Sequence, residues 1–142
     1  MGSGESYPEA KHVRIGGSTP VTDAANAARD FAVANGIMEH DLSRLCVIVE
    51  ELFANLYEHG GVGPDELVEL SLSASANVVR ILIIDPGRPF DPREARPGKR
   101  PSERGGGAGI QFVHKWASHV DYRTLGGRNH LELLVPVRGK GD

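Results

Sequence analysis

Apolar positions in the first half of the chain recur at the spacing of two amphipathic helices. The first covers the alanine-rich stretch 24–34, with Thr22 or Asp23 as its predicted N-cap and an Asn-Gly pair at its end. The second starts at Asp41 and stops at a Gly-Gly pair, residues 60–61. Each helix is predicted to bury one side. The apolar stripe of the second helix consists of Leu42, Leu45, Val49, Leu52 and Leu56.

Other segments have the patterns of strands. Residues 13–15 form a short first strand, and Val68, Leu70 and Leu72 alternate with polar residues, as in a half-buried strand. A turn at Ala76-Asn77 leads into residues 78–84, whose denser apolar content predicts a central strand. Two further strands form a predicted hairpin. They cover residues 120–125 and 130–135 and are joined by residues 126–129.

Residues 86–107 have no periodicity and form a predicted loop that is long for a compact domain. A helix is expected after it, at residues 110–117. Helices combined with mostly hairpin-linked strands predict an α+β fold: a two-layer α/β sandwich with a mixed, mostly antiparallel sheet and helices on one face. We expect one domain, residues 11–138, between a disordered N-terminal segment (1–10) and a polar tail (139–142).

Composition restricts the class of protein. The 142 residues are 39% hydrophobic and 25% charged, which is typical of a globular domain. The longest apolar run, residues 79–84, is too short to cross a bilayer. A net charge of -3 gives no general attraction to nucleic acid or to an anionic membrane. The single cysteine, Cys46, excludes an internal disulfide and favours the cytoplasm.

The polar side of the second predicted helix carries a carboxylate and a carboxamide. Glu51 and Asn55 are four residues apart, within about 40° of each other around a helix axis, and Glu58 falls on the same side. A carboxylate can orient or deprotonate a hydroxyl nucleophile, and an amide oxygen suits Mg²⁺. An isolated pair of this kind is more often a solvated acidic face. The pair therefore needs support from elsewhere in the sequence.

The predicted central strand ends in an acidic turn. Asp85 follows the apolar residues Ile83 and Ile84, and Gly87 comes two residues later. An aspartate at the end of a buried strand can accept a hydrogen bond from an exocyclic amine such as that of adenine, and glycine lets backbone approach a flat ring closely. Asp-Pro-Gly is equally typical of a simple turn, so this segment alone does not separate the two interpretations.

The long loop ends in a glycine cluster before the next predicted helix. Such glycines expose backbone N–H groups that can hold phosphates, with a flexible connector as the alternative. Residues 88–104 contain six arginines and lysines against three acids, which suits an anion. The Rossmann and P-loop fingerprints do not fit. The candidate phosphate-binding residues are Arg104, Gly105, Gly106, Gly107, Ala108 and Gly109.

The order of these segments is more specific than any one of them. Glu-x-x-x-Asn on a helix, a strand ending in Asp-x-Gly and glycines before a helix together resemble the Bergerat ATP-binding fold of the GHKL superfamily. In particular, the chain resembles the bacterial anti-sigma-factor serine/threonine kinases. Three boxes carry this resemblance: ELFAN with a following HG (51–60), DPGRPFDP (85–92) and GGAGIQFV (106–113). It extends over roughly residues 13–137.

The resemblance implies a role for each candidate residue and implies ATP and Mg²⁺ as cofactors. Glu51 is the implied general base toward a serine or threonine hydroxyl, and Asn55 is the implied Mg²⁺ ligand. Asp85 is expected to bind the adenine amino group, with Gly87 making room beneath the ring. The glycines of residues 105–109 are expected to close over the phosphates, with Arg104 as a cationic helper.

The resemblance also implies partners. The chain is expected to transfer the ATP γ-phosphate to an anti-sigma-factor antagonist-like protein, and a sigma factor and a second copy of the chain are further implied partners. Two alternatives stay open. One is an ATP-dependent partner-switching module without significant kinase activity, which needs Asp85 but not Glu51. The other is the catalytic domain of a histidine kinase, for which the loop is short and the phosphoacceptor hairpin is missing.

The sequence departs from the common family pattern in two places. Ala108 stands where a larger apolar residue is frequent, and Glu50 adds a second carboxylate next to Glu51. Adjacent residues on a helix point to different faces, so Glu50 is expected to be structural or to face solvent. Pro86 leaves Asp85 usable, because proline removes only the donor at its own position.

Overall fold

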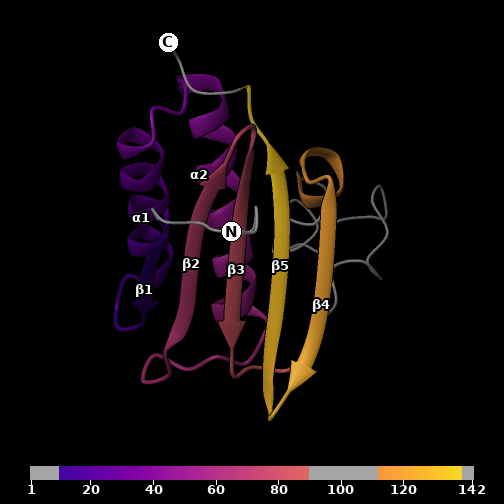
Figure 1. Cartoon of the computed structure of the whole chain (residues 1–142). Coiled ribbons are helices and arrows are strands. Elements are labelled where there is room, and N and C mark those ends of the chain that lie inside the picture. Colours follow the sequence, from indigo (N-terminus) through magenta and orange to yellow (C-terminus); the bar gives the residue numbers. More distant parts are fainter. Residues whose placement is uncertain (1–9, 90–111, 139–142) are drawn as a thin grey trace.

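The computed structural model describes residues 10–89 and 112–138 of the chain (Figure 1). In these two ranges the helices and strands are β1 (Lys11–Ile15), α1 (Pro20–Ala34), α2 (Glu39–Glu58), β2 (Val68–Ser75), β3 (Val78–Asp85), β4 (His119–Leu125) and β5 (Arg128–Pro136). Residues 112–116, which end two residues before β4, are also helical, in agreement with the predicted helix. The turn predicted at Ala76-Asn77 joins β2 to β3.

The five strands form one sheet in the order β1-β2-β3-β5-β4. The predicted sheet was mixed and mostly antiparallel, whereas every pairing within the described residues is antiparallel. The central position of β3 agrees with its dense apolar content. Because β3 pairs with β5 rather than with β4, the strand that follows it along the described chain is not its neighbour in the sheet.

Helices α1 and α2 cover one face of this sheet, and the opposite face has no helix over it in the described part of the molecule (Figure 1). The α+β two-layer prediction is therefore confirmed. Side chains between the helices and the sheet form the core. The largest of the fully buried ones are Phe53, Leu45, Ile48, Leu70, Leu72, Ile81, Ile83 and Leu133.

Helix α1 begins earlier than predicted, and the assignment of Thr22 or Asp23 as its N-cap is wrong. The helix starts at Pro20, and Thr19 occupies the N-cap position. Proline is favoured in the first turn because its fixed φ suits a helix and its missing N–H needs no partner there. Asp23 still contributes to this helix start, since its carboxylate accepts the Thr19 hydroxyl at 3.1 Å.

Helix α2 begins at Glu39, two residues before the predicted start, and ends at Glu58. Asp41 lies in its first turn and is buried. The carboxylate of Asp41 accepts the backbone N–H of Arg138 at 2.8 Å, so it ties the start of α2 to the segment after β5. In the described ranges, neither α2 nor any other helix has the length and apolarity that a membrane span requires.

The connection between β4 and β5 is shorter than the predicted residues 126–129. Gly126 and Gly127 alone form it, with φ of 58° and 79°. Two-residue hairpin turns favour this backbone conformation because its twist matches that of the strands, and glycine adopts it freely. Asn129 is consequently a strand residue and pairs with Asp85 of β3. This correction determines the composition of the site described below.

Candidate functional site

The polar side of α2 presents Glu51 and Asn55 one helical turn apart. Both side chains are half-buried, whereas the neighbouring Glu50 is exposed. Four residues correspond to about 6 Å along a helix axis, so the carboxylate and the amide lie on one side of α2 and at adjacent levels. The two polar groups predicted from the sequence are therefore neighbours on the surface of this helix.

The surroundings of Glu51 make its carboxylate more basic than usual. Partial burial raises the pKa of Glu51, and the negative charges of Glu50 and Glu58 raise it further. Burial acts in this direction because it disfavours the charged form, and nearby like charges do the same. A carboxylate with a raised pKa is a better proton acceptor than one in water, as a general base requires.

Asp85 ends the central strand β3 and is almost completely buried, with 4% of its surface exposed. One oxygen of its carboxylate, Oδ1, accepts two hydrogen bonds. The backbone N–H of Gly87 donates at 2.7 Å, and the side-chain amide of Asn129 donates at 3.0 Å. Among the described residues, none donates a hydrogen bond to the second oxygen, Oδ2. Within the described part of the chain, Oδ2 thus remains an acceptor without a donor.

The charge of this buried carboxylate depends on its partners. Burial raises the pKa of Asp85, while the hydrogen bonds from Asn129 and Gly87 and the positive charges of Arg128 and His130 lower it. Burial is the larger influence, so the net pKa is above the ordinary value of 3.8. Without its two hydrogen bonds, Asp85 would be still easier to protonate.

Gly87 allows the loop after β3 to contact the end of α2. A Cβ atom at this position would lie 2.5 Å from the carbonyl oxygen of Gly60 and 2.9 Å from Val62 Cγ2, both closer than real Cβ contacts. The next residue, Arg88, donates its backbone N–H to the same Gly60 carbonyl at 2.8 Å. Its guanidinium also donates to the carbonyl of His59. These contacts bring the loop that follows Asp85 against the C-terminal end of α2.

The last turn of α2 is held from the other side as well. The carbonyl of Asn55 accepts the N–H groups of His59 and Gly60, both at 2.8 Å, and so closes the helix. The hydroxyl of Tyr57 donates to the carbonyl of Ile15 on β1 at 3.1 Å. Asn55 therefore lies on a backbone that is fixed against both the sheet and the loop after β3.

Asn129 belongs to this site, although no role was predicted for it. It lies in β5 with 1% of its surface exposed, and its amide nitrogen donates both to Asp85 and to the carbonyl of Gly87, the latter at 2.9 Å. The sequence placed Asn129 in the hairpin turn, where an asparagine is unremarkable. One feature of the sequence could have indicated this role: the asparagine lies two residues after a Gly-Gly pair and in phase with the alternating residues of the strand that follows.

The predicted phosphate-binding cluster, Arg104 to Gly109, lies outside the described residues. The segment that follows it is held on α2. The rings of Phe112 and Trp116 stack with centroids 4.7 Å apart, and the guanidinium of Arg44 lies over the Trp116 ring at 5.1 Å. A cation over an aromatic face is attractive. Residues 112–116 are thus packed against the polar-faced helix that carries Glu51 and Asn55.

The described residues fit a magnesium ion that is held mainly by substrate. In residues 10–89 and 112–138, three or more histidine, cysteine, aspartate or glutamate side chains never gather into a metal-binding group. Mg²⁺ often keeps several waters and uses one or two protein oxygens together with phosphate oxygens. The amide oxygen of Asn55 is a donor of this kind, on the same side of α2 as Glu51.

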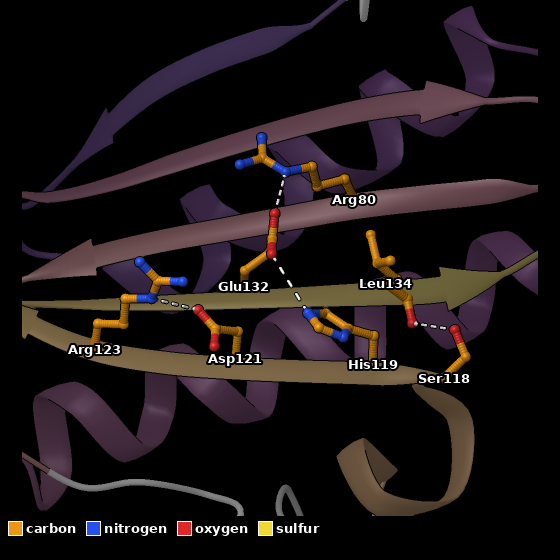
Figure 2. Close-up of polar contacts among 7 residues, drawn as sticks. All are labelled: Arg80, Ser118, His119, Asp121, Arg123, Glu132 and Leu134. Carbon is orange, nitrogen blue, oxygen red and sulfur yellow. Dashed lines mark hydrogen bonds and ion pairs between the residues drawn. The ribbon is translucent and has the colours of Figure 1, made fainter. Parts of the chain in front are cut away.

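A separate set of polar contacts lies on the face of the sheet opposite to the helices. Figure 2 shows Glu132 between Arg80 and His119, with Nε of Arg80 bonded to one carboxylate oxygen and His119 Nε2 3.5 Å from the other. Asp121 and Arg123 form a second pair at 3.0 Å. All five side chains are partly exposed. They line the open face and take no part in the site around Asp85.

The antiparallel sheet with helices on one face, and with a long connection between β3 and β4, defines a two-layer ATPase domain of the Bergerat, or GHKL, type. The sequence pattern of the histidine kinase-like ATPase domain matches residues 18–135. The chain belongs to this family. The match covers both helices, the site residues described above and the strands β2, β3, β4 and all but the last residue of β5, and it confirms the resemblance to the GHKL superfamily.

A solved structure supports the same fold. A chain in the crystal structure of the SiaB–SiaC complex from Pseudomonas aeruginosa superposes with a TM-score of 0.53, at 14% identity and over 89% of each chain. At this identity the likeness concerns the fold alone. None of the curated proteins matches the chain.

Proposed function

We propose that the chain is an ATP-binding serine/threonine protein kinase of the anti-sigma regulatory type. The observation that carries this proposal is the buried carboxylate of Asp85, which ends the central strand with Oδ1 bonded to Gly87 and Asn129 and with no described residue donating to Oδ2. In a family of ATPase domains, such an acceptor matches the amino group of adenine.

The adenine end of the site is built from Asp85 and Gly87. The Oδ2 atom accepts one N–H of the adenine amino group, and the ring lies beside the loop at Gly87, whose close packing against the end of α2 leaves no room for a side chain. Since Gly87 also contacts Gly60, adenine lies next to the end of α2. The phosphates then extend along α2 toward Asn55 and Glu51.

The reacting end of the site is built from Asn55 and Glu51. Mg²⁺, when bound, neutralises phosphate charge, and the Asn55 amide oxygen holds it. Glu51 accepts the proton of the attacking serine or threonine hydroxyl, for which its raised pKa is favourable. Phosphoryl transfer asks the protein mainly for positioning and charge neutralisation. The glycines of residues 105–109 and Arg104 are assigned to the phosphates as part of the same proposal.

The phosphoacceptor in this proposal is a folded protein of the anti-sigma-factor antagonist type, with a sigma factor as a second partner. The solved structure of similar fold comes from a complex of two proteins, SiaB and SiaC. This supports a protein, rather than a small molecule, as the acceptor. The open face of the sheet and the far sides of α1 and α2 are the surfaces that remain for such contacts.

Isothermal titration with Mg-ATP tests the nucleotide site. We expect the wild-type protein to bind and Asp85→Asn to lose at least about tenfold in affinity, because a hydrogen bond to a charged group contributes about 1.5–3 kcal/mol. Asp121→Asn is the matched control, since the same change is made on the open face of the sheet. Equal affinity of wild type and Asp85→Asn would contradict the site.

Transfer of phosphate from labelled ATP to a candidate antagonist protein tests the kinase assignment. We expect Glu51→Gln to abolish transfer while ATP binding persists, and Glu50→Gln to retain transfer because Glu50 is exposed. If wild type binds ATP but phosphorylates no serine or threonine, the kinase assignment is wrong. If Glu51→Gln still releases and captures partners normally in cells, the switching alternative is favoured.

A further inference from the structure

The amide of Asn129 has all its hydrogen-bonding groups engaged in a buried setting. Its nitrogen donates to Asp85 Oδ1 at 3.0 Å and to the Gly87 carbonyl at 2.9 Å, and its oxygen accepts the Thr124 hydroxyl at 3.1 Å. The opposite amide orientation would place an oxygen against two acceptors, the carboxylate and the carbonyl. The chemistry of these neighbours therefore selects one orientation of the amide.

We propose that Asn129, oriented by Thr124, is a positioning residue that keeps Asp85 as an acceptor and thereby determines the preference of the site for an amino-bearing purine. This inference rests on the proposed nucleotide site at Asp85. Three strands contribute to the device, because Asp85 ends β3, Asn129 lies in β5 and Thr124 lies in β4. Thr124 and Asn129 are register partners, as are Asn129 and Asp85.

The first part of the argument is geometric. A carboxylate that accepts two hydrogen bonds at one oxygen cannot rotate without breaking them, so Oδ2 of Asp85 is held in one position. The same Asn129 nitrogen also holds the Gly87 carbonyl, so the acceptor atom and the loop on which the purine rests are fixed relative to each other. Without the Asn129 amide, both the Asp85 carboxylate and the loop at Gly87 lose this restraint.

The second part of the argument concerns the protonation of Asp85. Burial favours the neutral form of Asp85, and Asn129 opposes this because its N–H stabilises the negative charge. Among the described residues, the other charged or titratable groups that act on Asp85 are Arg128 and His130 on β5 and Tyr57 on α2. Glu69 on β2 lies 3.9 Å from Arg128. These groups are unchanged in an Asn129 variant, so a change in the ionisation of Asp85 reports on Asn129.

The third part of the argument links the protonation of Asp85 to the choice between adenine and guanine. An ionised carboxylate only accepts hydrogen bonds, whereas a protonated one can also donate. Adenine carries an amino group at the position where guanine carries a carbonyl. An ionised Asp85 therefore binds adenine and repels guanine, while a protonated Asp85 can donate to the guanine carbonyl. A site that keeps Asp85 ionised discriminates between the two purines, and a site that lets it protonate discriminates less.

The experiment compares three variants with wild type. Asn129→Leu removes the amide at similar size, Asn129→Asp replaces the donor with a second carboxylate, and Thr124→Val removes only the group that orients the amide. Leu131→Ala is the control for general destabilisation, because Leu131 is buried two residues along the same strand and on the same face. The readouts are the carbon NMR titration of the Asp85 carboxyl in ligand-free protein, and the affinities for Mg-ATP and Mg-GTP as a function of pH.

We expect the pKa of Asp85 to rise in Asn129→Leu, so that ATP binding is lost at a higher pH than in wild type. At neutral pH we expect roughly tenfold weaker ATP binding and a smaller ratio of ATP to GTP affinity. Asn129→Asp should show a larger change in the same direction, and Thr124→Val a smaller one that is measurable even if the Asn129 variants fold poorly. Leu131→Ala should change stability and leave the Asp85 titration in place.

An Asp85 titration that is the same in wild type, Asn129→Leu and Thr124→Val would overturn the inference, whatever the nucleotide affinities are. An equal shift in Leu131→Ala would overturn it too, because the effect would then be general. Failure of the proposed function looks different. In that case wild type binds no ATP, or Asp85→Asn binds it equally well, while the NMR titration still reports whether Asn129 controls the proton of Asp85.

Discussion

The two faces of the sheet use polar residues in different ways. On the open face, Glu132 pairs with Arg80 and His119, and Asp121 pairs with Arg123, all with partly exposed side chains (Figure 2). On the helix-covered face, the described strands bury apolar side chains except at one end, where Asp85 and Asn129 are buried together. Charges on the first face remain hydrated, whereas the charge on the second does not.

Polar side chains on the open face are in hydrated surroundings that suit them, whereas the buried charge of Asp85 is unfavourable in its surroundings. Exposed ion pairs change stability little, because water already solvates both partners. A buried carboxylate costs stability unless hydrogen bonds satisfy it, and in Asp85 only one of the two oxygens is satisfied by described residues. In the function proposed above, this incompletely satisfied acceptor is the group that binds the nucleotide. The comparison of faces therefore points to the same candidate site without reference to any motif.

The largest expected effect on stability comes from the core behind the site. Ile81 is fully buried on the helix-covered side of β3, so Ile81→Ala should lower the free energy of unfolding by about 2–5 kcal/mol in urea titrations. Leu82→Ala, one residue along on the open face, should cost about 1 kcal/mol or less because Leu82 is only half-buried. Similar losses for the two variants would remove the distinction between the faces.

The next effect concerns the contact between α2 and the loop after β3. Gly87→Ala should cost about 1–3 kcal/mol, because the new Cβ would meet the rigid Gly60 carbonyl at 2.5 Å. Gly63→Ala is the matched control, since the nearest atom is a flexible Glu66 carboxylate oxygen at 3.8 Å. Thermal unfolding of both variants measures the difference. Equal melting temperatures would show that the contact with α2 is not tight.

A smaller effect on stability is expected from the buried carboxylate of Asp85, and this effect depends on pH. Because the pKa of folded Asp85 is above the ordinary 3.8, the unfolded chain loses this proton first as the pH rises. Wild-type stability should therefore fall relative to Asp85→Asn from about pH 3.8 upward and become parallel to it above the raised pKa. Urea titrations of ligand-free protein over this pH range measure it. A stability difference that does not change with pH would contradict the raised pKa.

The smallest effect is expected on the open face. Glu132→Gln removes the charge that Arg80 and His119 share, and it should change the free energy of unfolding by about 0–1 kcal/mol, with less effect at high salt. Nucleotide affinity should be unchanged. A loss of several kcal/mol, or a loss of ATP binding, would show that this face is coupled to the site.

The sequence predicted the local elements well because hydrophobic spacing is a local property. The apolar stripe of α2 and the alternation in β2 each follow from neighbouring residues, and both elements were confirmed. The errors arose at boundaries. The N-cap of α1 was placed at Thr22 or Asp23 instead of Thr19, and Asn129 was placed in the turn, because single polar residues before a helix or after a Gly-Gly pair permit several positions.

The candidate site was predicted in part. The order of the motifs indicated Asp85, Gly87, Glu51 and Asn55 as members of one nucleotide site, and the structure brings the loop at Gly87 against the end of α2 through Gly60. Roles for these residues, and for the glycine cluster, remain predictions. No role was predicted for Asn129, because its hydrogen bond to Asp85 joins residues that are 44 positions apart in the sequence.

By itself, the sequence determined the helix and strand patterns, the α+β class and the family, because periodicity and motif order depend only on the order and spacing of residues along the chain. Only the tertiary structure decided that β5 lies beside β3 and that its register sets Asn129 opposite Asp85. The physical reason is that strand pairing joins distant segments. Whether a carboxylate is buried, and which of its oxygens has a partner, depends on side chains that become neighbours only after the sheet has formed.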